Sequence, residues 1–268
     1  PPMPEPVVLV AREGGVATLT LNRPKALNAL DRDLTLALNE SLMKLEGDTS
    51  VRCIVLRGGE HFMAGGDLKW FKSLSDGKSP AENRAQFEGF IHEAHAIIRC
   101  LRRMPKPVIA GVRGAVAGFG MSLMMACDLA LAADNAYFTL AYTLIGVSPD
   151  GGSTFALPRV VGQKKAMEIA LLGERFDAAA AERLGLVNRI IPSASLDAEL
   201  EKMANRFAQG PTRVYARTKA LLNGSLGATL DEQLEREAQA FAQSASEPDF
   251  AEGVAAFIEK RKPRFTGA

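Results

Sequence analysis

The glycine-rich stretch that decides the fold reads Gly114-Ala115-Val116-Ala117-Gly118-Phe119-Gly120-Met121-Ser122. It follows an apolar run, residues 107–112, that predicts a buried strand, and it precedes residues 123–126, which predict a helix. A strand, a glycine turn and a helix start aim free backbone N–H groups at one point, which favours an anion or a developing oxyanion. Close strand–helix packing also needs glycine, so a purely structural role is the alternative. The dinucleotide fingerprint is not met, because its third glycine and the following acidic residue are missing.

A second loop combines glycines with an acidic residue. It reads His61-Phe62-Met63-Ala64-Gly65-Gly66-Asp67-Leu68 and follows a buried strand predicted over residues 53–56. Two glycines let the backbone approach a ligand without a Cβ clash. The alternative is a plain turn that starts the next helix, with Asp67 as its N-cap.

A third loop places an acidic residue among apolar neighbours. It reads Ile145-Gly146-Val147-Ser148-Pro149-Asp150-Gly151-Gly152-Ser153. An acid between proline and glycine is commonly a turn former or a helix N-cap. The apolar surroundings favour a second interpretation, because burial would raise the pKa of the Asp150 carboxyl and make it a competent base toward a weak carbon acid.

Strands and helices alternate along the first part of the chain. Strands are predicted over residues 16–21, 53–56, 107–112 and 129–133, with helices after Asp31 and over residues 81–103. This alternation is typical of an α/β core. From Gly162 onward the pattern is helical, around one short strand-like run at residues 186–191. The helices are expected to begin near Lys164, Asp177, Leu196, Pro211, Leu230 and Pro248.

Composition and charge exclude several classes of protein. Of 268 residues, 47% are hydrophobic and 24% charged, as in ordinary globular proteins. A net charge of +1 creates no field that would attract nucleic acid or a membrane surface. No run of 18 apolar residues is present, so no transmembrane helix is expected. Residues 1–6 (PPMPEP) predict a stiff exposed leader rather than a signal peptide, and a cytoplasmic protein is expected.

Cysteine and histidine form no recognisable site. Cys53, Cys100 and Cys127 are widely spaced in apolar stretches, which predicts buried free thiols. His92 and His95 lie three residues apart on the predicted long helix without a third ligand, so no metal is expected. No GxSxG nucleophile elbow is present, which leaves little support for a serine hydrolase.

Taken together, the loops resemble those of the crotonase family, also called the enoyl-CoA hydratase/isomerase superfamily. The resemblance spans almost the whole chain and implies an α/β spiral of ββα units over residues 1–200. It also implies a helical C-terminal trimerisation region over residues 201–268, in a homotrimer or a dimer of trimers. The stretches that carry it, in the order of the family, are Leu21-Asn22-Arg23-Pro24-Lys25-Ala26-Leu27-Asn28-Ala29-Leu30, Ala64-Gly65-Gly66-Asp67-Leu68, residues 114–120, Leu157-Pro158-Arg159 and Phe257-Ile258-Glu259-Lys260-Arg261.

The resemblance implies roles for individual residues. An acyl-CoA thioester would be the substrate, with coenzyme A as part of it and no separate cofactor. The N–H groups of Gly66 and Phe119 would hold the thioester oxygen. The family usually has glycine where Phe119 stands, which a backbone donor tolerates, and the phenyl group is expected to narrow the acyl pocket. The residues expected to contact substrate or coenzyme A are Lys25, Ala26, Leu27, Ala64, Asp67, Leu68, Tyr142, Phe257 and Lys260, the last two sometimes reaching the nucleotide portion from a neighbouring subunit.

Departures from the family pattern bear on the reaction. The two glutamates of the family's hydratases correspond here to Ser122 and Tyr142, neither of which activates water as a carboxylate does. Asp150 matches the acid of several isomerases of the family and of 4-chlorobenzoyl-CoA dehalogenase. The hypothesis is therefore a double-bond shift in fatty acid metabolism, such as Δ3-to-Δ2 enoyl-CoA isomerisation. Asp150 would move a proton from the α to the γ carbon while the enolate rests on the Gly66 and Phe119 N–H groups.

Other functions stay open. In aryl-CoA dehalogenation Asp150 would attack the ring as a nucleophile. His95 aligns with a histidine that the dehalogenase uses, whereas Tyr142 stands in place of its tryptophan. Enoyl-CoA hydration with water positioned by other groups, and a non-catalytic coenzyme A-binding scaffold, are further alternatives. The acyl group is unspecified, but an aromatic or medium aliphatic group would suit the aromatic residues Trp70, Phe71, Phe87 and Phe90.

Overall fold

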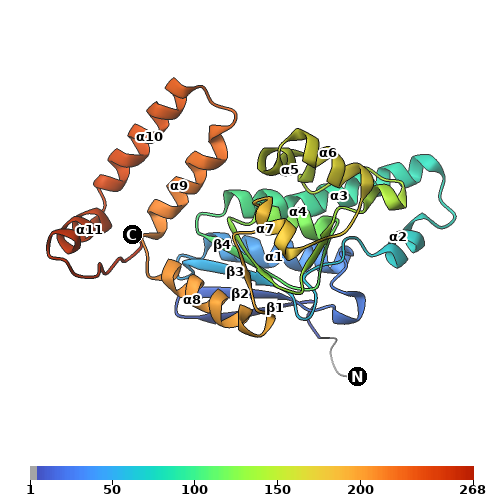
Figure 1. The fold of residues 1–268 in the computed structure, drawn as a ribbon, viewed down its shortest axis with the longest axis horizontal. Helices are drawn as coiled ribbons and strands as arrows, with labels where there is room; N and C mark the ends of the chain where they lie inside the picture. The colour runs from blue at the N-terminus through green and yellow to red at the C-terminus, as the bar shows by residue number, and fades with distance from the viewer. Residues whose placement is uncertain (1–4) are drawn as a thin grey trace.

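A computed structural model describes residues 5–268 and shows a central sheet between layers of helices (Figure 1). The expected leader at residues 1–6 lies mostly outside the described residues. The strands are β1 (Val8–Glu13), β2 (Val16–Leu21), β3 (Cys53–Arg57), β4 (Val108–Val112), β5 (Ala115–Ala117), β6 (Leu129–Ala133), β7 (Tyr137–Thr139), β8 (Phe176–Asp177) and β9 (Arg189–Ile191). The α-helices are α1 (Arg32–Gly47), α2 (Leu68–Ser75), α3 (Pro80–Arg103), α4 (Phe119–Ala126), α5 (Ser153–Val161), α6 (Gln163–Leu172), α7 (Ala178–Arg183), α8 (Leu196–Ala208), α9 (Thr212–Ser225), α10 (Leu230–Ala245) and α11 (Pro248–Ile258).

The main sheet has six strands in the order β1-β2-β3-β4-β6-β9. Only β1 and β2 pair antiparallel, and every other neighbouring pair in this sheet is parallel. All residues of β4 are buried, as expected of a strand in a parallel sheet that is covered on both faces. A smaller sheet joins β5, β7 and β8. The α/β fold class predicted from the sequence is confirmed.

The two faces of the main sheet pack against different helices. Ile54 and Leu56 of β3 belong to the core that α1 and α3 cover, and the Asp31 side chain caps α1 by accepting from the Leu34 N–H at 2.9 Å. Cys53 and Val55, which alternate with them, pack against α8 on the opposite face. The alternation of one strand thus divides the apolar core into two layers.

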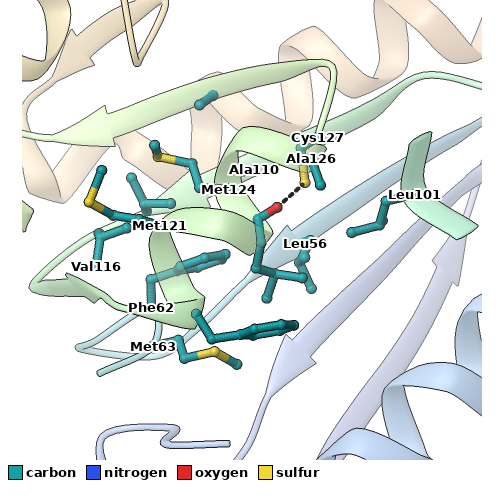
Figure 2. Close-up of a cluster of buried hydrophobic side chains, with 14 of the residues drawn as sticks. Leu56, Phe62, Met63, Leu101, Ala110, Val116, Met121, Met124, Ala126 and Cys127 are labelled. Carbon is teal, nitrogen blue, oxygen red and sulfur yellow. Dashed lines mark hydrogen bonds between the residues drawn. The ribbon is translucent and has the colours of Figure 1, made fainter. Parts of the chain in front are cut away.

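Helix α4 begins at Phe119, four residues before the helix start predicted at residue 123. The prediction was wrong because Gly118, at φ 50°, makes the turn alone, while Gly120 lies inside the helix against Met63. Figure 2 shows the buried side chains that fix this helix, among them Met121 and Met124. The Cys127 thiol donates to the Leu123 carbonyl at 3.4 Å. The first turn of α4 therefore rests on a rigid core.

The C-terminal helices α9, α10 and α11 form a group that extends away from the sheet (Figure 1). The expected boundary between residues 200 and 201 falls within α8, which packs on the sheet. The Lys219 ammonium on α9 ties this group to the core, donating at 2.8 Å to both the Leu101 carbonyl and the Asp128 carboxylate.

Other expectations are tested by burial and length. Cys53, Cys100 and Cys127 are buried and free, as predicted. The strand expected over residues 186–191 is shorter and spans Arg189–Ile191. No helix within residues 5–268 is long and apolar enough to cross a membrane.

Candidate active site

Two glycine loops meet at the ends of the parallel strands. Met63 of the first loop pairs with the β5 segment of the second, donating to the Ala115 carbonyl at 3.0 Å and accepting from the Ala117 N–H at 2.9 Å. Immediately beyond this pairing, Gly65 and Gly118 touch: a Cβ added at Gly118 would lie 3.4 Å from the Gly65 Cα. Both glycines have a positive φ, 95° at Gly65 and 50° at Gly118, which residues with a side chain rarely adopt, so this close approach of the loops depends on glycine.

The residues that follow these glycines present free backbone donors. Within residues 5–268, neither the Gly66 N–H nor the Phe119 N–H donates to a protein acceptor. Phe119 is the first residue of α4, where an N–H has no partner in the helix and the helix dipole favours negative charge. Gly66 is held by strand-like pairing with Leu30, whose N–H donates to the Gly65 carbonyl at 2.7 Å. Both N–H groups are available to an external oxygen.

Asp67 is a structural carboxylate, as the plain-turn interpretation had it. Its side chain accepts from the Lys69 and Trp70 N–H groups at 3.1 Å each and so caps α2. The Arg23 guanidinium lies 3.0 Å from Asp67 and 2.7 Å from Asp31. Burial alone would raise the pKa of Asp67, but these hydrogen bonds and the guanidinium hold it below its usual value.

Arg23 and Asn28 shape the first loop, and the sequence did not single them out. The buried Asn28 amide donates to the His61 carbonyl at 2.8 Å, and its oxygen accepts from the Arg23 N–H at 2.7 Å. Both residues lie within the stretch at residues 21–30 that carries the family resemblance. Their partners are distant in sequence, since Arg23 and Asp67 are 44 positions apart, so only the motif itself could have drawn attention to them.

Asp150 lies beside the second loop. Its Oδ1 accepts a hydrogen bond from the Tyr142 hydroxyl, and the Tyr142 ring lies against the glycine turn, with its Cζ 3.8 Å from a Cβ added at Gly118. The Ser122 hydroxyl of α4 donates to the Asp150 carbonyl at 3.0 Å. Asp150 is thus held between Tyr142 and the first turn of α4, the same turn that exposes the Phe119 N–H.

Burial dominates the electrostatics of this carboxyl. Desolvation raises the pKa of Asp150 above its usual value, although the Tyr142 hydrogen bond and the His95 ring work in the other direction. Desolvation and the nearby carboxylate raise the pKa of Tyr142, which keeps the phenol a hydrogen-bond donor. A carboxyl of raised pKa that can still ionise is suited to accept and return a proton.

His95 supports the backbone of the Asp150 turn. Its Nε2 accepts from the Gly151 N–H at 3.0 Å, which requires the ring proton of neutral His95 to be on Nδ1. Desolvation lowers the pKa of His95, with the Asp150 carboxylate opposing this shift. The nitrogen nearest the turn is therefore already engaged.

The residues expected to contact coenzyme A fall into two places. Lys25 and Ala26 lie in a short 3-10 helix, Pro24–Ala26, and Leu27 follows it, its carbonyl accepting from the Ala64 N–H at 3.1 Å. With Asp67 and Leu68, these residues border the first glycine loop. Phe257 lies near the end of α11 and Lys260 follows this helix, in the group that projects from the core (Figure 1). The Phe257 residue is 86% exposed. One chain does not bring the two groups together.

Four aromatic side chains from α2 and α3 cluster beside Gly66. The Trp70 and Phe90 ring centroids lie 4.7 Å apart, and Phe71 lies 5.3 Å from Phe87. Both pairs are edge-to-face, a favourable geometry for aromatic rings. A Cβ added at Gly66 would lie 2.5 Å from the Phe71 Cζ, so the cluster reaches the backbone donor itself.

Comparison with known proteins identifies the family of the chain. The family model described as enoyl-CoA hydratase/isomerase matches residues 11–268, and the chain belongs to this family. It is 37% identical over 256 residues to a 1,2-epoxyphenylacetyl-CoA isomerase of Escherichia coli (strain K12), covering 95% of this chain and 96% of the relative. It is 35% identical to 4-chlorobenzoyl coenzyme A dehalogenase-2 of Arthrobacter sp, covering 94% and 91%.

A solved structure extends the likeness to a third reaction. The crystal structure of an enoyl-CoA hydratase from Mycobacterium smegmatis superposes with a TM-score of 0.90 at 36% identity, covering 97% of this chain and 99% of the other. These names share an acyl-CoA substrate and differ in the chemistry. The chain is therefore an acyl-CoA enzyme of the family, and the choice of reaction depends on its own side chains.

Proposed function

We propose that the chain is an enoyl-CoA isomerase that shifts a double bond with Asp150 as its one acid–base group. The observation that carries the proposal is the placement of this desolvated carboxyl between Tyr142 and the α4 turn that exposes the Phe119 N–H. The hydratase glutamates of the family are replaced here by Ser122 and Tyr142. A double-bond shift needs no water and hence no second carboxylate. Coenzyme A enters as part of the substrate, with no further cofactor.

The proposed proton transfer passes through a single enolate. The Tyr142 hydroxyl donates to Oδ1 of Asp150, and within residues 5–268 no donor contacts Oδ2. Oδ2 therefore removes a proton from the α carbon of a 3-enoyl thioester. The C–H electron pair forms a Cα–C1 double bond, and the thioester oxygen takes the negative charge. The Gly66 and Phe119 N–H groups bind this oxygen. The electron pair then returns from this oxygen to re-form the C1–O double bond. The carbon–carbon double bond moves to the α,β position, and the γ carbon takes the proton from Asp150.

The neighbouring side chains support isomerisation over hydration. Ser122 is 2% exposed, and its hydroxyl is used to hold the Asp150 carbonyl. Tyr142 has a raised pKa and acts as a donor. His95 uses Nε2 to accept from the Gly151 N–H. None of the three is free to take a proton from water.

The test is label transfer in a 3-enoyl-CoA that carries deuterium at the α carbon. A single carboxyl that both removes and returns the proton carries part of the label to the γ carbon of the 2-enoyl product, which mass spectrometry measures. We expect Asp150→Asn to lower the formation of conjugated product, and the transfer with it, by about 10²–10⁴-fold. Asp76→Asn is the matched control, because the Asp76 carboxylate is exposed and pairs with the exposed Lys72. Near-normal turnover by Asp150→Asn would remove the assigned base.

Aryl-CoA dehalogenation is the second candidate, supported by His95 beside the Asp150 turn and by the likeness to the Arthrobacter dehalogenase. In that reaction an Asp150 oxygen would attack the ring, chloride would leave, and water would hydrolyse the aryl ester. Chloride release from 4-chlorobenzoyl-CoA, followed through several turnovers, distinguishes it from isomerisation. Tight thioester binding with no turnover of any substrate would indicate a scaffold instead.

The acyl group and the assembly are further parts of the proposal. We expect the acyl chain to lie against Trp70, Phe71, Phe87 and Phe90 beside Gly66, which suits a ring-bearing or medium-length group. The chain is expected to form a homotrimer or a dimer of trimers. The supporting observation is an exposed apolar surface on the C-terminal helices, including Leu222, Leu226, Phe241, Phe257 and Ile258. Light scattering coupled to gel filtration measures the assembly directly.

A further inference from the structure

Beneath the Asp150 turn, the side chains of Phe119 and Ser122 meet Gly151 without space between them. A Cβ added at Gly151 would lie 2.5 Å from the Ser122 Cβ, 2.8 Å from its Oγ and 3.0 Å from the Phe119 Cδ2. Carbon atoms in contact stay about 3.5–4.0 Å apart, so neither a methyl group nor a water molecule of similar size fits there. Phe119 and Ser122 are 3% and 2% exposed, so solvent scarcely reaches either.

A partly open cavity borders this contact, with walls from α3, α4, α5 and α9. Its volume is about 440 Å³, and Ser122, Gly151 and Gly152 form part of its wall. Since one water occupies roughly 30 Å³ in the liquid, the cavity has room for several. The lining does not include Asp150, Tyr142 or Phe119. Ser122 and Gly151 therefore border both a space that can hold water and the turn that carries Asp150.

We propose that Phe119, Ser122 and Gly151 form a seal that keeps water from Asp150 and so selects proton transfer over hydration. Phe119 then has two separate functions, an N–H for the thioester oxygen and a phenyl group that closes the base of the site. The phenyl group and Ser122 are positioning residues, acting through the Asp150 turn. The proposal rests on the isomerase function and adds what determines its product.

The chemistry explains why a seal is needed. The product of isomerisation is a conjugated 2-enoyl thioester, whose β carbon accepts a hydroxide equivalent. With water present, Asp150 would take a proton from it, the oxygen would bond to the β carbon, and the α carbon would take the proton. The same oxygen-binding N–H groups would stabilise that enolate. The exclusion of water therefore decides whether the 2-enoyl product is released or is converted to a 3-hydroxyacyl thioester.

Water behind the turn would also change the carboxyl. The groups that face Asp150 are the Tyr142 hydroxyl and the His95 ring, and both already favour its charged form. Desolvation is the larger effect and keeps the pKa raised. Opening the seal would hydrate the carboxylate and lower this pKa, so the acid limb of the activity profile would move to lower pH.

The experiment truncates the phenyl group while the backbone N–H stays in place. Phe119→Ala is compared with Phe119→Leu, which retains most of the side-chain volume, using a 3-enoyl-CoA and quantifying 2-enoyl and 3-hydroxyacyl products by mass spectrometry. The ratio of hydrated to isomerised product rises at least about tenfold in Phe119→Ala, and isomerisation slows by roughly 10- to 100-fold because the turn loses its support. Phe119→Leu gives a smaller rise in this ratio than Phe119→Ala, because it keeps most of the side-chain volume at the contact with Gly151. An unchanged ratio in a folded Phe119→Ala overturns the seal.

A second measurement separates failure of the seal from failure of the isomerase function. Exchange of the α protons of butyryl-CoA in D₂O needs the base, the two N–H groups and water at the Asp150 carboxyl, but no double bond. If the wild type does not isomerise a 3-enoyl-CoA but exchange is faster in Phe119→Ala than in the wild type, the proposed reaction is wrong and the seal stands. Exchange in Phe119→Ala that is no faster than in the wild type overturns the seal. If Phe119→Ala does not fold, Phe119→Val provides the same readouts.

Discussion

Asp67 and Asp150 both stand beside a pair of glycines, yet their chemistry is opposite. One follows two glycines and the other precedes two glycines, each after a turn. Asp67 accepts from two backbone N–H groups and pairs with the Arg23 guanidinium, and its pKa is lowered. Among residues 5–268, the Asp150 carboxylate receives a hydrogen bond from the Tyr142 hydroxyl alone; it is desolvated, and its pKa is raised. The partners of a carboxyl, rather than its motif, decide whether it stabilises the fold or moves protons.

The largest difference is expected in activity. Asp150→Asn removes the only assigned base, and we expect kcat to fall by about 10²–10⁴-fold, the usual contribution of a general acid–base group. Asp67→Asn keeps an acceptor for the α2 cap and leaves the base intact, so kcat falls much less while stability drops. Steady-state isomerisation of both variants, with circular dichroism to check folding, measures this. Equal losses of kcat would break the distinction between the two acids.

The second-largest effect is expected on stability, through the Arg23 guanidinium that pairs with Asp67. Arg23→Gln leaves Asp31 and Asp67 close together without their shared guanidinium, and we expect a loss of about 2–3 kcal/mol in the free energy of unfolding. Because the Arg23 side chain is only 19% exposed, we expect this loss of stability to be larger than for a surface ion pair. Urea denaturation is the measurement, and Lys44→Gln, whose partner Glu40 is exposed, is the control with a change below about 0.5 kcal/mol. A loss in Arg23→Gln no larger than that of the control would contradict the argument.

Tyr142→Phe sharpens the comparison by removing the hydroxyl that donates to the Asp150 carboxylate. This hydrogen bond lowers the pKa of Asp150, so the pKa rises further without it. Because Asp150 must be ionised to act as a base, the acid limb of kcat/KM moves to higher pH. A hydrogen bond to a charged group is worth about 1.5 kcal/mol, which corresponds to a shift of roughly one pH unit. A limb that stays in place or moves down would show that Tyr142 does not tune the base.

The strands and the glycine loops of this site were predictable from the sequence, whereas β1 and the first turn of α4 were not. Apolar runs ending in glycine marked β3, β4 and the two loops, because a buried parallel strand and a close backbone approach each restrict residue type. β1 was missed because only Val8 is buried in it and no alternation appears. The first turn of α4 was taken for loop because Gly118 and Gly120 look alike in the sequence, although only Gly118 turns the chain.

The partners of the two acids were not predictable, because they depend on contacts between distant segments. Arg23 meets Asp67 across 44 positions, and His95 meets Gly151 across 56. The aspartate motifs therefore left two interpretations open. The family resemblance favoured one of them for Asp150 without supplying its geometry.

The smallest expected effect is on the dependence of stability on pH, and its sign differs between the two acids. Asp67 has a lowered pKa when folded, so its stabilisation is present above the unfolded-state pKa and is lost as pH falls through the folded value. Asp150 has a raised pKa when folded, so stability contributed by its protonated form is lost as pH rises above the unfolded-state value.

At neutral pH, then, ionised Asp150 costs the fold some stability that its function requires. We expect Asp150→Asn to raise Tm by on the order of a few degrees at pH 7, with a smaller gain at pH 4, where the protonated wild-type carboxyl carries less penalty. Asp67→Asn lowers Tm at pH 7 and lowers it less at low pH. Differential scanning calorimetry of both variants at the two values measures the pair. A destabilised Asp150→Asn at pH 7 would mean that the Tyr142 hydrogen bond outweighs the desolvation of the carboxylate, and the assignment of Asp150 as a strained base would lose its physical ground.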